Sequence, residues 1–281
     1  MVVRKGNHGL LEDHPFLHHL YIWDKSKKYK SLFKITKQLK KQSYDLAVNI
    51  QRFGASGFMT WRSKAKLKIG FDKNPFARFF DHSLTHDIGS GRHEIERNND
   101  LIAELTNDVA FKPKLYPSTD SVRKVEQYKS EPYVCIAPSS VWFTKQVPKI
   151  KWIELINKTE EKIYLLGAPA DFELCESITE SCSQKKIENL CGKLNLLDSV
   201  ALISDAKMNF VNDSGPMHMA SSVNANCTAI YCSTVPEFGF GPLSDHSKII
   251  QVENLDCKPC GLHGHKYCPK GHFKCGQLLE I

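Results

Sequence analysis

The feature that most constrains the fold is a repeated unit in which a short apolar run ends in small or polar residues and a helical stretch follows. Six such runs are candidate strands: YDLAVNI (44–50), LKIGFD (67–72), YVCIAPSS (133–140), KIYLLGAP (162–169), MNFVN (208–212) and CTAIYCS (227–233). Helices are expected near 94–105, 151–159, 171–182 and 195–206. Strands that alternate with helices in this way predict βαβ units and parallel sheets, which is an α/β fold.

The stretch 107–131 interrupts this alternation. It carries Pro113, Pro117 and many charged residues, which is typical of a linker. The chain has 281 residues, enough for two domains of ordinary size. We therefore predict two α/β layers, residues 1–115 and 130–281, with the natural ligand site in a cleft between them.

Composition places the chain among globular proteins that do not span a membrane. Hydrophobic residues make up 41% and charged residues 25%, which argues against extended disorder. The sequence has no apolar run long enough to cross a bilayer, and its first residues lack the apolar segment of a secretory signal. A cytoplasmic protein is expected.

Much of the net charge of +7 lies in one segment. Leu32, Ile35, Thr36 and Leu39 keep helical spacing there, which predicts an amphipathic helix with a buried stripe. Eight lysines flank that stripe: Lys25, Lys27, Lys28, Lys30, Lys34, Lys37, Lys40 and Lys41. They form either a solvated helix face or a surface for an anionic partner. Nucleic acid is not the expected partner, because no aromatic-rich binding motif accompanies them.

The loop after the run at 133–140 combines small hydroxyl residues with a lysine. Ser139 and Ser140 offer hydroxyl and N–H groups, and Lys145 adds positive charge. Such a loop between a strand and a helix suits a phosphate or diphosphate. The glycine patterns of a P-loop and of a dinucleotide-binding turn are absent, so an ordinary surface loop is an equal alternative.

A second loop, NDSGPMHMA (212–220), follows the run MNFVN. Asp213 falls at the carboxyl end of that run, where ligands bind in parallel sheets. Pro216 suits the first turn of a helix, whose free N–H groups attract anions. Ser214, Gly215 and His218 complete the candidate group. The alternatives are a simple N-cap at Asp213–Ser214 and a partly buried, satisfied histidine at His218.

Together these loops resemble glycosyltransferase family 9, the ADP-heptose:lipopolysaccharide heptosyltransferases. SSVWFTKQVP (139–148) and NDSGPMHMA carry the resemblance most clearly, together with the terminal pattern C-x-P-C…C-P-x-G-H-x-x-C. YDLAVNIQ (44–51), KLKIGF (66–71) and HEIERN (93–98) agree with it. The resemblance extends from about Val2 to Cys275.

The resemblance implies the GT-B fold, with two Rossmann-like domains facing a cleft and a nucleotide-sugar in the second. Ser139, Ser140 and Lys145 would then hold the diphosphate of an ADP-sugar, while Asp213, Ser214, Gly215 and His218 would hold the sugar and phosphate. The implied reaction is inverting, metal-independent transfer of a heptose to the lipopolysaccharide inner core. The acceptor would be an anionic saccharide anchored in lipid, reached by a protein peripheral to the inner membrane.

The same resemblance leaves the catalytic base unassigned. In the family the usual base is an Asp in a Gly-Asp turn after the first strand, and the present sequence starts beyond that strand and helix. Asp13 lies in the segment LLEDHP, where we expect it to end a helix. Besides an enzyme, the sequence is therefore compatible with a non-catalytic protein that binds a nucleotide or a lipid core.

Ten cysteines fall into two groups. Six are expected to be reduced core residues: Cys135, Cys175, Cys182, Cys191, Cys227 and Cys232. The other four, Cys257, Cys260, Cys268 and Cys275, lie in a tail that also carries His263, His265 and His272. Cys257 and Cys260 have the spacing of a structural zinc half-site, but the second pair is more widely spaced. The tail is thus either a reduced, packed segment or a zinc site, and the latter would suit a zinc-stabilised interaction module.

Overall fold

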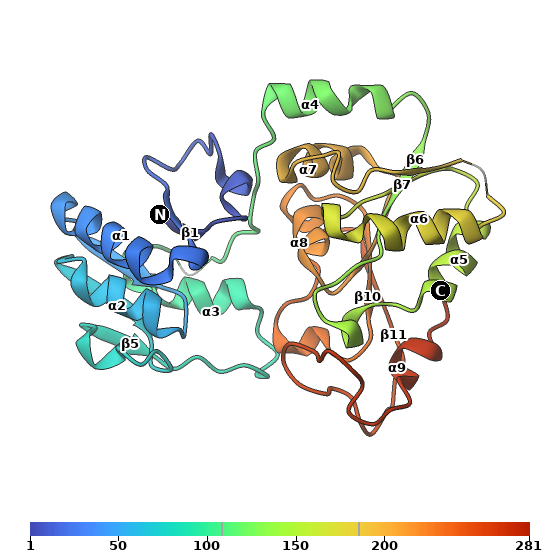
Figure 1. Ribbon diagram of the computed structural model, residues 1–281. Helices are drawn as coiled ribbons and strands as arrows, with labels where there is room; N and C mark the ends of the chain where they lie inside the picture. The colour runs from blue at the N-terminus through green and yellow to red at the C-terminus, as the bar shows by residue number, and fades with distance from the viewer. Residues whose placement is uncertain (108, 185) are drawn as a thin grey trace. The chain divides into compact units, whose positions relative to one another are not determined.

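The protein divides into two compact units, Met1–Phe111 and Lys112–Ile281, in a computed structural model (Figure 1). The structure describes residues 1–107, 109–184 and 186–281. Each unit has its own sheets and its own hydrophobic core, so each is described separately. None of the helices in the described ranges is long and apolar enough to cross a membrane.

The first unit contains two small parallel sheets. One pairs β1 (Val2–Arg4) with β2 (Tyr21–Trp23), and the other has the order β3 (Leu46–Asn49), β4 (Leu67–Phe71), β5 (His82–Leu84). The helices of this unit are η1 (His8–Leu11), η2 (Lys25–Lys27), α1 (Lys28–Gln42), α2 (Gly54–Arg62), η3 (Ala77–Phe79), α3 (Glu94–Asp100) and η4 (Ala103–Leu105). The strands expected at 44–50 and 67–72 are thus present as β3 and β4.

Helix α1 forms as its apolar spacing predicts. Leu32, Ile35, Thr36 and Leu39 are buried, and three of them join Tyr21 and Met59 in one core cluster. The helix ends at Ser43, whose left-handed backbone (φ 49°) cannot continue it. The short helix η1 ends at Glu12, whose backbone is extended, and Asp13 follows it with a left-handed backbone (φ 52°).

The second unit is built on one six-stranded parallel sheet. Its order is β11-β10-β9-β6-β7-β8, with β6 (Tyr133–Ala137) and β9 (Met208–Asn212) side by side at the centre. The remaining strands are β7 (Lys162–Leu165), β8 (Ile187–Asn189), β10 (Cys227–Tyr231) and β11 (Ser247–Gln251). From β6 the chain adds β7 and β8 toward one edge of the sheet. It then returns to the centre at β9 and adds β10 and β11 toward the other edge. The change of direction between β6 and β9 is a topological switch point, where ligands bind in sheets of this kind.

Helices cover both faces of this sheet. They are α4 (Thr119–Val125), η5 (Glu126–Tyr128), η6 (Phe143–Lys145), α5 (Lys149–Asn157), η7 (Pro169–Asp171), α6 (Phe172–Ser181), α7 (Leu196–Asp205), α8 (Gly215–Ser222), η8 (Pro236–Phe238) and α9 (Lys274–Gln277). Helix α7 starts with a capping box between Asn195 and Asp198. The six cysteines expected in the core are all buried.

The division between the two units falls inside the predicted linker 107–131, but the prediction is wrong for part of that stretch. Residues 119–128 are helical, and α4 packs beside α7 (Figure 1), where Lys124 Nζ lies 2.6 Å from Asp198 Oδ2. Because residues 107–131 carry many charges, the sequence pattern did not indicate a helix there. The buried face of α4 is short and consists of Ser121 and Val125. Residue 108 of the predicted linker lies outside the described residues.

Candidate functional site

The loops that follow β6 and β9 leave the sheet next to each other. The two strands pair in parallel with Ala137 opposite Val211, so their carboxyl ends meet at the same edge. One loop carries Ser139, Ser140 and Lys145, and the other carries Asp213. The topology therefore brings together two segments that are far apart in the sequence.

An ion pair joins these two loops. Lys145 Nζ lies 2.7 Å from Asp213 Oδ2, and the two side chains are only 15% and 10% exposed. The Thr234 hydroxyl, from the segment after β10, donates to the same carboxylate oxygen at 2.6 Å. Asp213 thus holds a cation and a hydroxyl group at the place where β6, β9 and β10 all end.

Asn212 fixes the geometry of the loops beneath this pair. It is fully buried, and its Oδ1 accepts from the Val147 N–H at 3.0 Å. Its Nδ2 donates to the carbonyls of Pro138 and Ser139 at 2.8 and 3.1 Å. One side chain therefore ties both ends of the loop that carries Lys145 to the end of β9. The sequence interpretation missed this residue, although its place just before Asp213 was a signal.

Ser139 and Ser140 are half-buried at the start of the same loop. The Ser139 carbonyl accepts from Asn212, and the Ser140 carbonyl accepts from Gln146 Nε2. These bonds fix the backbone of the two serines. Through Asn212, Ser139 is linked to the end of β9, directly before Asp213.

Helix α8 begins immediately after Asp213. Ser214 is its N-cap residue, but in the described structure the Ser214 side chain makes no capping hydrogen bond. The Asp213 carboxylate turns to Lys145 and Thr234, so the alternative in which this carboxylate caps the helix is wrong. Gly215 and His218 are exposed in the first turns, so the partial burial that the alternative assigned to His218 is not observed.

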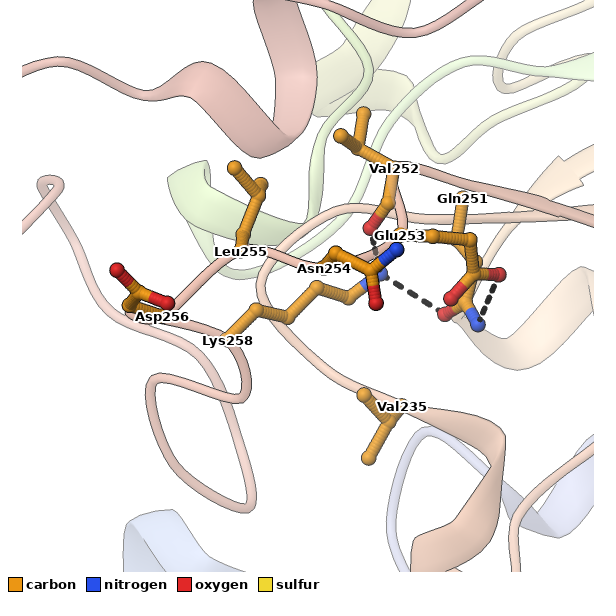
Figure 2. Close-up of a pocket in the computed structure, with 8 residues that line it drawn as sticks. All are labelled: Val235, Gln251, Val252, Glu253, Asn254, Leu255, Asp256 and Lys258. Carbon is orange, nitrogen blue, oxygen red and sulfur yellow. Dashed lines mark hydrogen bonds between the residues drawn. The ribbon is translucent and has the colours of Figure 1, made fainter.

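A cavity of about 310 Å³ lies beyond this site, where the segment after β11 turns (Figure 2). It is lined by Val235, Gln251, Val252, Glu253, Asn254, Leu255, Asp256 and Lys258. Lys258 Nζ donates to Gln251 Oε1 at 2.8 Å, and burial lowers the pKa of this lysine. Because Val235 follows Thr234 directly, the cavity and the Lys145–Asp213 site share the segment after β10.

The tail cysteines make separate contacts in the described structure. Cys257 Sγ and His272 Nε2 lie 3.9 Å apart, and the Cys260 thiol donates to the Cys257 carbonyl. Within the described ranges, no group of three or more His, Cys, Asp or Glu side chains is placed to hold a metal ion. Cys275 is buried in the core of the second unit.

A parallel α/β fold with paired loops at a switch point defines a class of proteins that bind ligands at the carboxyl edge of the sheet. Residues 32–270 match the sequence model of glycosyltransferase family 9 (heptosyltransferase). The chain therefore belongs to this family, as the resemblance predicted. Lipopolysaccharide heptosyltransferase 1 of Campylobacter coli is 26% identical over 267 residues, which cover 87% of this chain and 77% of that protein.

Solved structures agree in fold. The E. coli ADP-heptose lps heptosyltransferase II superposes with a TM-score of 0.76 at 20% identity, over 92% of this chain and 85% of that one. The E. coli heptosyltransferase WaaC with ADP gives a TM-score of 0.68 at 18% identity, over 88% of this chain and 82% of that one. These neighbours are GT-B glycosyltransferases, and the predicted α/β fold with parallel sheets is confirmed. The protein is a glycosyltransferase of the heptosyltransferase type.

Proposed function

We propose that the second unit, predicted from the sequence as residues 130–281, binds an ADP-linked heptose at the Lys145–Asp213 site. Ser139, Ser140 and Lys145 take the diphosphate in this proposal, while Asp213, Ser214, Gly215 and His218 together hold the sugar and the adjacent phosphate, with the Asp213 carboxylate on the sugar. The observation that carries the proposal is the 2.7 Å pair between Lys145 and Asp213, which joins two loops at a switch point. The related E. coli heptosyltransferase WaaC was solved with ADP, which supports this choice of nucleotide.

The proposed chemistry is inverting transfer without a metal. The acceptor hydroxyl attacks the anomeric carbon from the face opposite the nucleotide, the bond to the diphosphate oxygen breaks, and ADP leaves. Negative charge then grows on the leaving diphosphate. A lysine and the N–H groups at the start of α8 are suited to stabilise that charge. A general base must accept the proton of the acceptor hydroxyl, and we assign no residue to this role.

The single-residue test of the donor site is Lys145→Ala. Losing one charge-assisted contact costs about 1.5–3 kcal/mol, so ADP should bind roughly ten- to a hundred-fold more weakly. Lys37→Ala, on the exposed face of α1, is the matched control and should leave the affinity unchanged. Titration calorimetry with ADP compares both variants with the parent. Equal affinity for the Lys145 variant and the parent would remove the basis of the proposed donor site.

For the first unit, predicted as residues 1–115, we propose contact with the acceptor, an anionic saccharide anchored in lipid. Between Lys25 and Tyr44 the chain has eight lysines and no carboxylate. Phe33 is 60% exposed beside this lysine face and contacts Phe58, which continues to the stacked rings of Trp61 and Phe79. Lysines next to exposed aromatic rings suit the interface of an anionic bilayer. We place the enzyme at the cytoplasmic face of the inner membrane.

Vesicle binding tests this membrane proposal. Attraction to an anionic surface is worth about 1 kcal/mol per lysine, so Lys30→Glu, Lys34→Glu and Lys37→Glu together should weaken binding to phosphatidylglycerol vesicles at least about a hundred-fold. The control reverses three exposed lysines of the second unit, Lys193, Lys248 and Lys270. Phosphatidylcholine vesicles should bind neither protein. An equal loss in both triple variants would show that net charge, and not this helix face, drives the association.

Two other functions are separated by direct assays. A non-catalytic protein would bind ADP-heptose without releasing ADP in the presence of acceptor, whereas the proposed enzyme releases one ADP per heptose transferred.

A zinc-stabilised interaction module would contain close to one equivalent of zinc, lost in the variant Cys257→Ser with Cys260→Ser. We propose instead that the tail cysteines are reduced and packed, so protein purified without chelator should contain no stoichiometric zinc.

A further inference from the structure

Thr144, the residue before Lys145, is joined to two segments that are remote in the sequence. Its side chain is almost fully buried, and its hydroxyl oxygen accepts from the Ser233 hydroxyl at 2.9 Å and from the His265 N–H at 2.8 Å. Its backbone makes two further bonds, since its N–H donates to the His265 carbonyl and its carbonyl accepts from the Ser233 N–H. Thr144 thus fastens the Lys145 loop to the end of β10 and to the tail.

Gly264, in the same part of the tail, lies against the stem of Lys145. Its backbone has φ +76°, which favours glycine, and a Cβ atom placed there would lie 2.9 Å from Lys145 Cγ. The same atom would lie 3.1 Å from Thr144 Oγ1 and 3.1 Å from Trp142 Cβ. The tail backbone therefore covers the aliphatic part of Lys145, while the ammonium group reaches Asp213.

The tail segment is itself anchored to the segment after β10, which carries Thr234. The Cys260 N–H donates to the Ser233 carbonyl at 2.9 Å. His265 Nε2 lies 2.9 Å from the Cys260 carbonyl, where it donates a hydrogen bond. The exit of β10, the 257–265 segment and the Lys145 loop consequently form one hydrogen-bonded unit. A lysine side chain has about 2 kcal/mol of rotamer entropy to lose on binding, and a fixed stem reduces that loss.

We propose that Gly264 and Thr144 are positioning residues, through which the cysteine-rich tail orients Lys145 toward the diphosphate of the donor. This inference rests on the proposed donor site and adds a task for the tail, which is otherwise a packed end of the chain. Neither residue touches the ligand in this proposal. Both act on the direction and mobility of the Lys145 side chain.

The test is Gly264→Ala, with Gly271→Ala as the matched control. Gly271 lies in the same tail with φ +74°, and a Cβ placed there meets nothing within 4 Å among the described residues. Both variants carry the same backbone strain, but only the first displaces Lys145. We expect Gly264→Ala to raise the Kd for ADP about tenfold, as for a weakened charge-assisted contact, and Gly271→Ala to leave it within about twofold. Titration calorimetry gives the affinities, and circular dichroism checks that both variants fold.

A second pair of variants covers the case in which Gly264→Ala fails to fold. Thr144→Val removes the hydroxyl oxygen and should weaken ADP binding, whereas Thr144→Ser keeps that oxygen and should restore affinity close to the parent. In a Lys145→Ala background neither Gly264→Ala nor Thr144→Val should weaken binding further, which a merely structural role would not produce. If Lys145→Ala weakens ADP binding but the Gly264 and Thr144 variants do not, the positioning role is overturned and the donor site stands. If Lys145→Ala has no effect, both proposals fall.

Discussion

Lys145 Nζ lies 2.7 Å from Asp213 Oδ2, so the cation proposed to bind the donor diphosphate is already paired with a carboxylate of the protein. An incoming diphosphate must compete with Asp213 for the same ammonium group. The carboxylate is also held by the Thr234 hydroxyl, which keeps it in place when Lys145 turns to the ligand. The pair therefore orients Lys145 before binding at some cost in affinity for anions.

Asp213→Asn tests this competition. The amide keeps the shape of the side chain but loses its charge, so ADP should bind roughly three- to tenfold more tightly. Heptose transfer should fall in the same variant, because the sugar loses a carboxylate contact. Calorimetry with ADP and an ADP-release assay give the two values. The control is Asp205→Asn, which breaks the pair with Lys129 on another part of the unit and should change neither. Weaker ADP binding by Asp213→Asn would mean that orientation of Lys145 outweighs competition.

Asn212→Ala should destabilise the second unit strongly. The change leaves the buried Val147 N–H and the carbonyls of Pro138 and Ser139 without their partner. We expect a loss of about 2–4 kcal/mol in the free energy of unfolding, because each unsatisfied buried group costs about 1–3 kcal/mol. Asn226→Ala removes a single side-chain bond to the Lys207 carbonyl and should cost about 1 kcal/mol or less. Urea unfolding of both variants measures these losses. Similar losses in the two variants would show that Asn212 contributes no more to stability than an ordinary hydrogen-bonded asparagine.

Prediction from the sequence succeeded where a local pattern decides the structure. Strand β6 reads as a continuous apolar run because both faces of a parallel sheet are covered, and the stripe of α1 follows from helical spacing. Asp213 was found because it ends such a run. Short edge strands such as β8 and β11 were missed, since three to five residues next to charged neighbours give little signal.

The contacts that organise the site lay beyond any local pattern. Thr144 and His265 are hydrogen-bonded although they are 121 residues apart in the sequence. Asn212 binds the backbone of Pro138, 74 residues earlier in the sequence. Such hydrogen bonds depend on where the folded chain brings the partners, which neither residue type nor spacing reveals. The same holds for α4, because its buried residues are buried by packing on α7, a contact that the sequence does not reveal.

Alkylation separates the environments of two tail cysteines. Burial acts to raise the pKa of the Cys268 thiol, but the nearby N–H groups of the turn outweigh it, and this pKa lies below its ordinary value. Burial raises the pKa of Cys275 to about 11. Since the thiolate is the reactive form, iodoacetamide at pH 8 should label Cys268 at least about ten times faster. Peptide mapping by mass spectrometry measures both rates. Equal protection of all four tail cysteines, abolished by a chelator, would instead indicate zinc.

The pair between Lys124 and Asp198 should make stability depend on pH in the acid range. The Asp198 side chain is 2% exposed and lies 2.6 Å from Lys124 Nζ, which ties α4 to the start of α7. Burial acts to raise the pKa of Asp198, but hydrogen bonds from Lys124, the Asn195 N–H and Ser121 together lower it below 3.8. A carboxyl whose pKa is depressed by folding stabilises the protein above its unfolded value, and that contribution is lost as the pH falls from 3.8 through the folded value.

Asp198→Asn should therefore cost about 1–3 kcal/mol of unfolding free energy at pH 7, and less as the pH falls below 3.8. Asp120→Asn is the control, because its ion pair with Arg123 at 3.3 Å is exposed and exposed pairs contribute about 0–1 kcal/mol. Urea unfolding at pH 7 and at pH 3 measures all three proteins. The difference between the parent and the Asp198 variant should shrink as the pH falls, because protonation then begins to remove the charge from the parent as the substitution does from the variant. A difference between them that stays constant with pH would mean that Asp198 stabilises α7 through hydrogen bonding at the helix start, and that the charge of the Lys124 pair contributes nothing measurable.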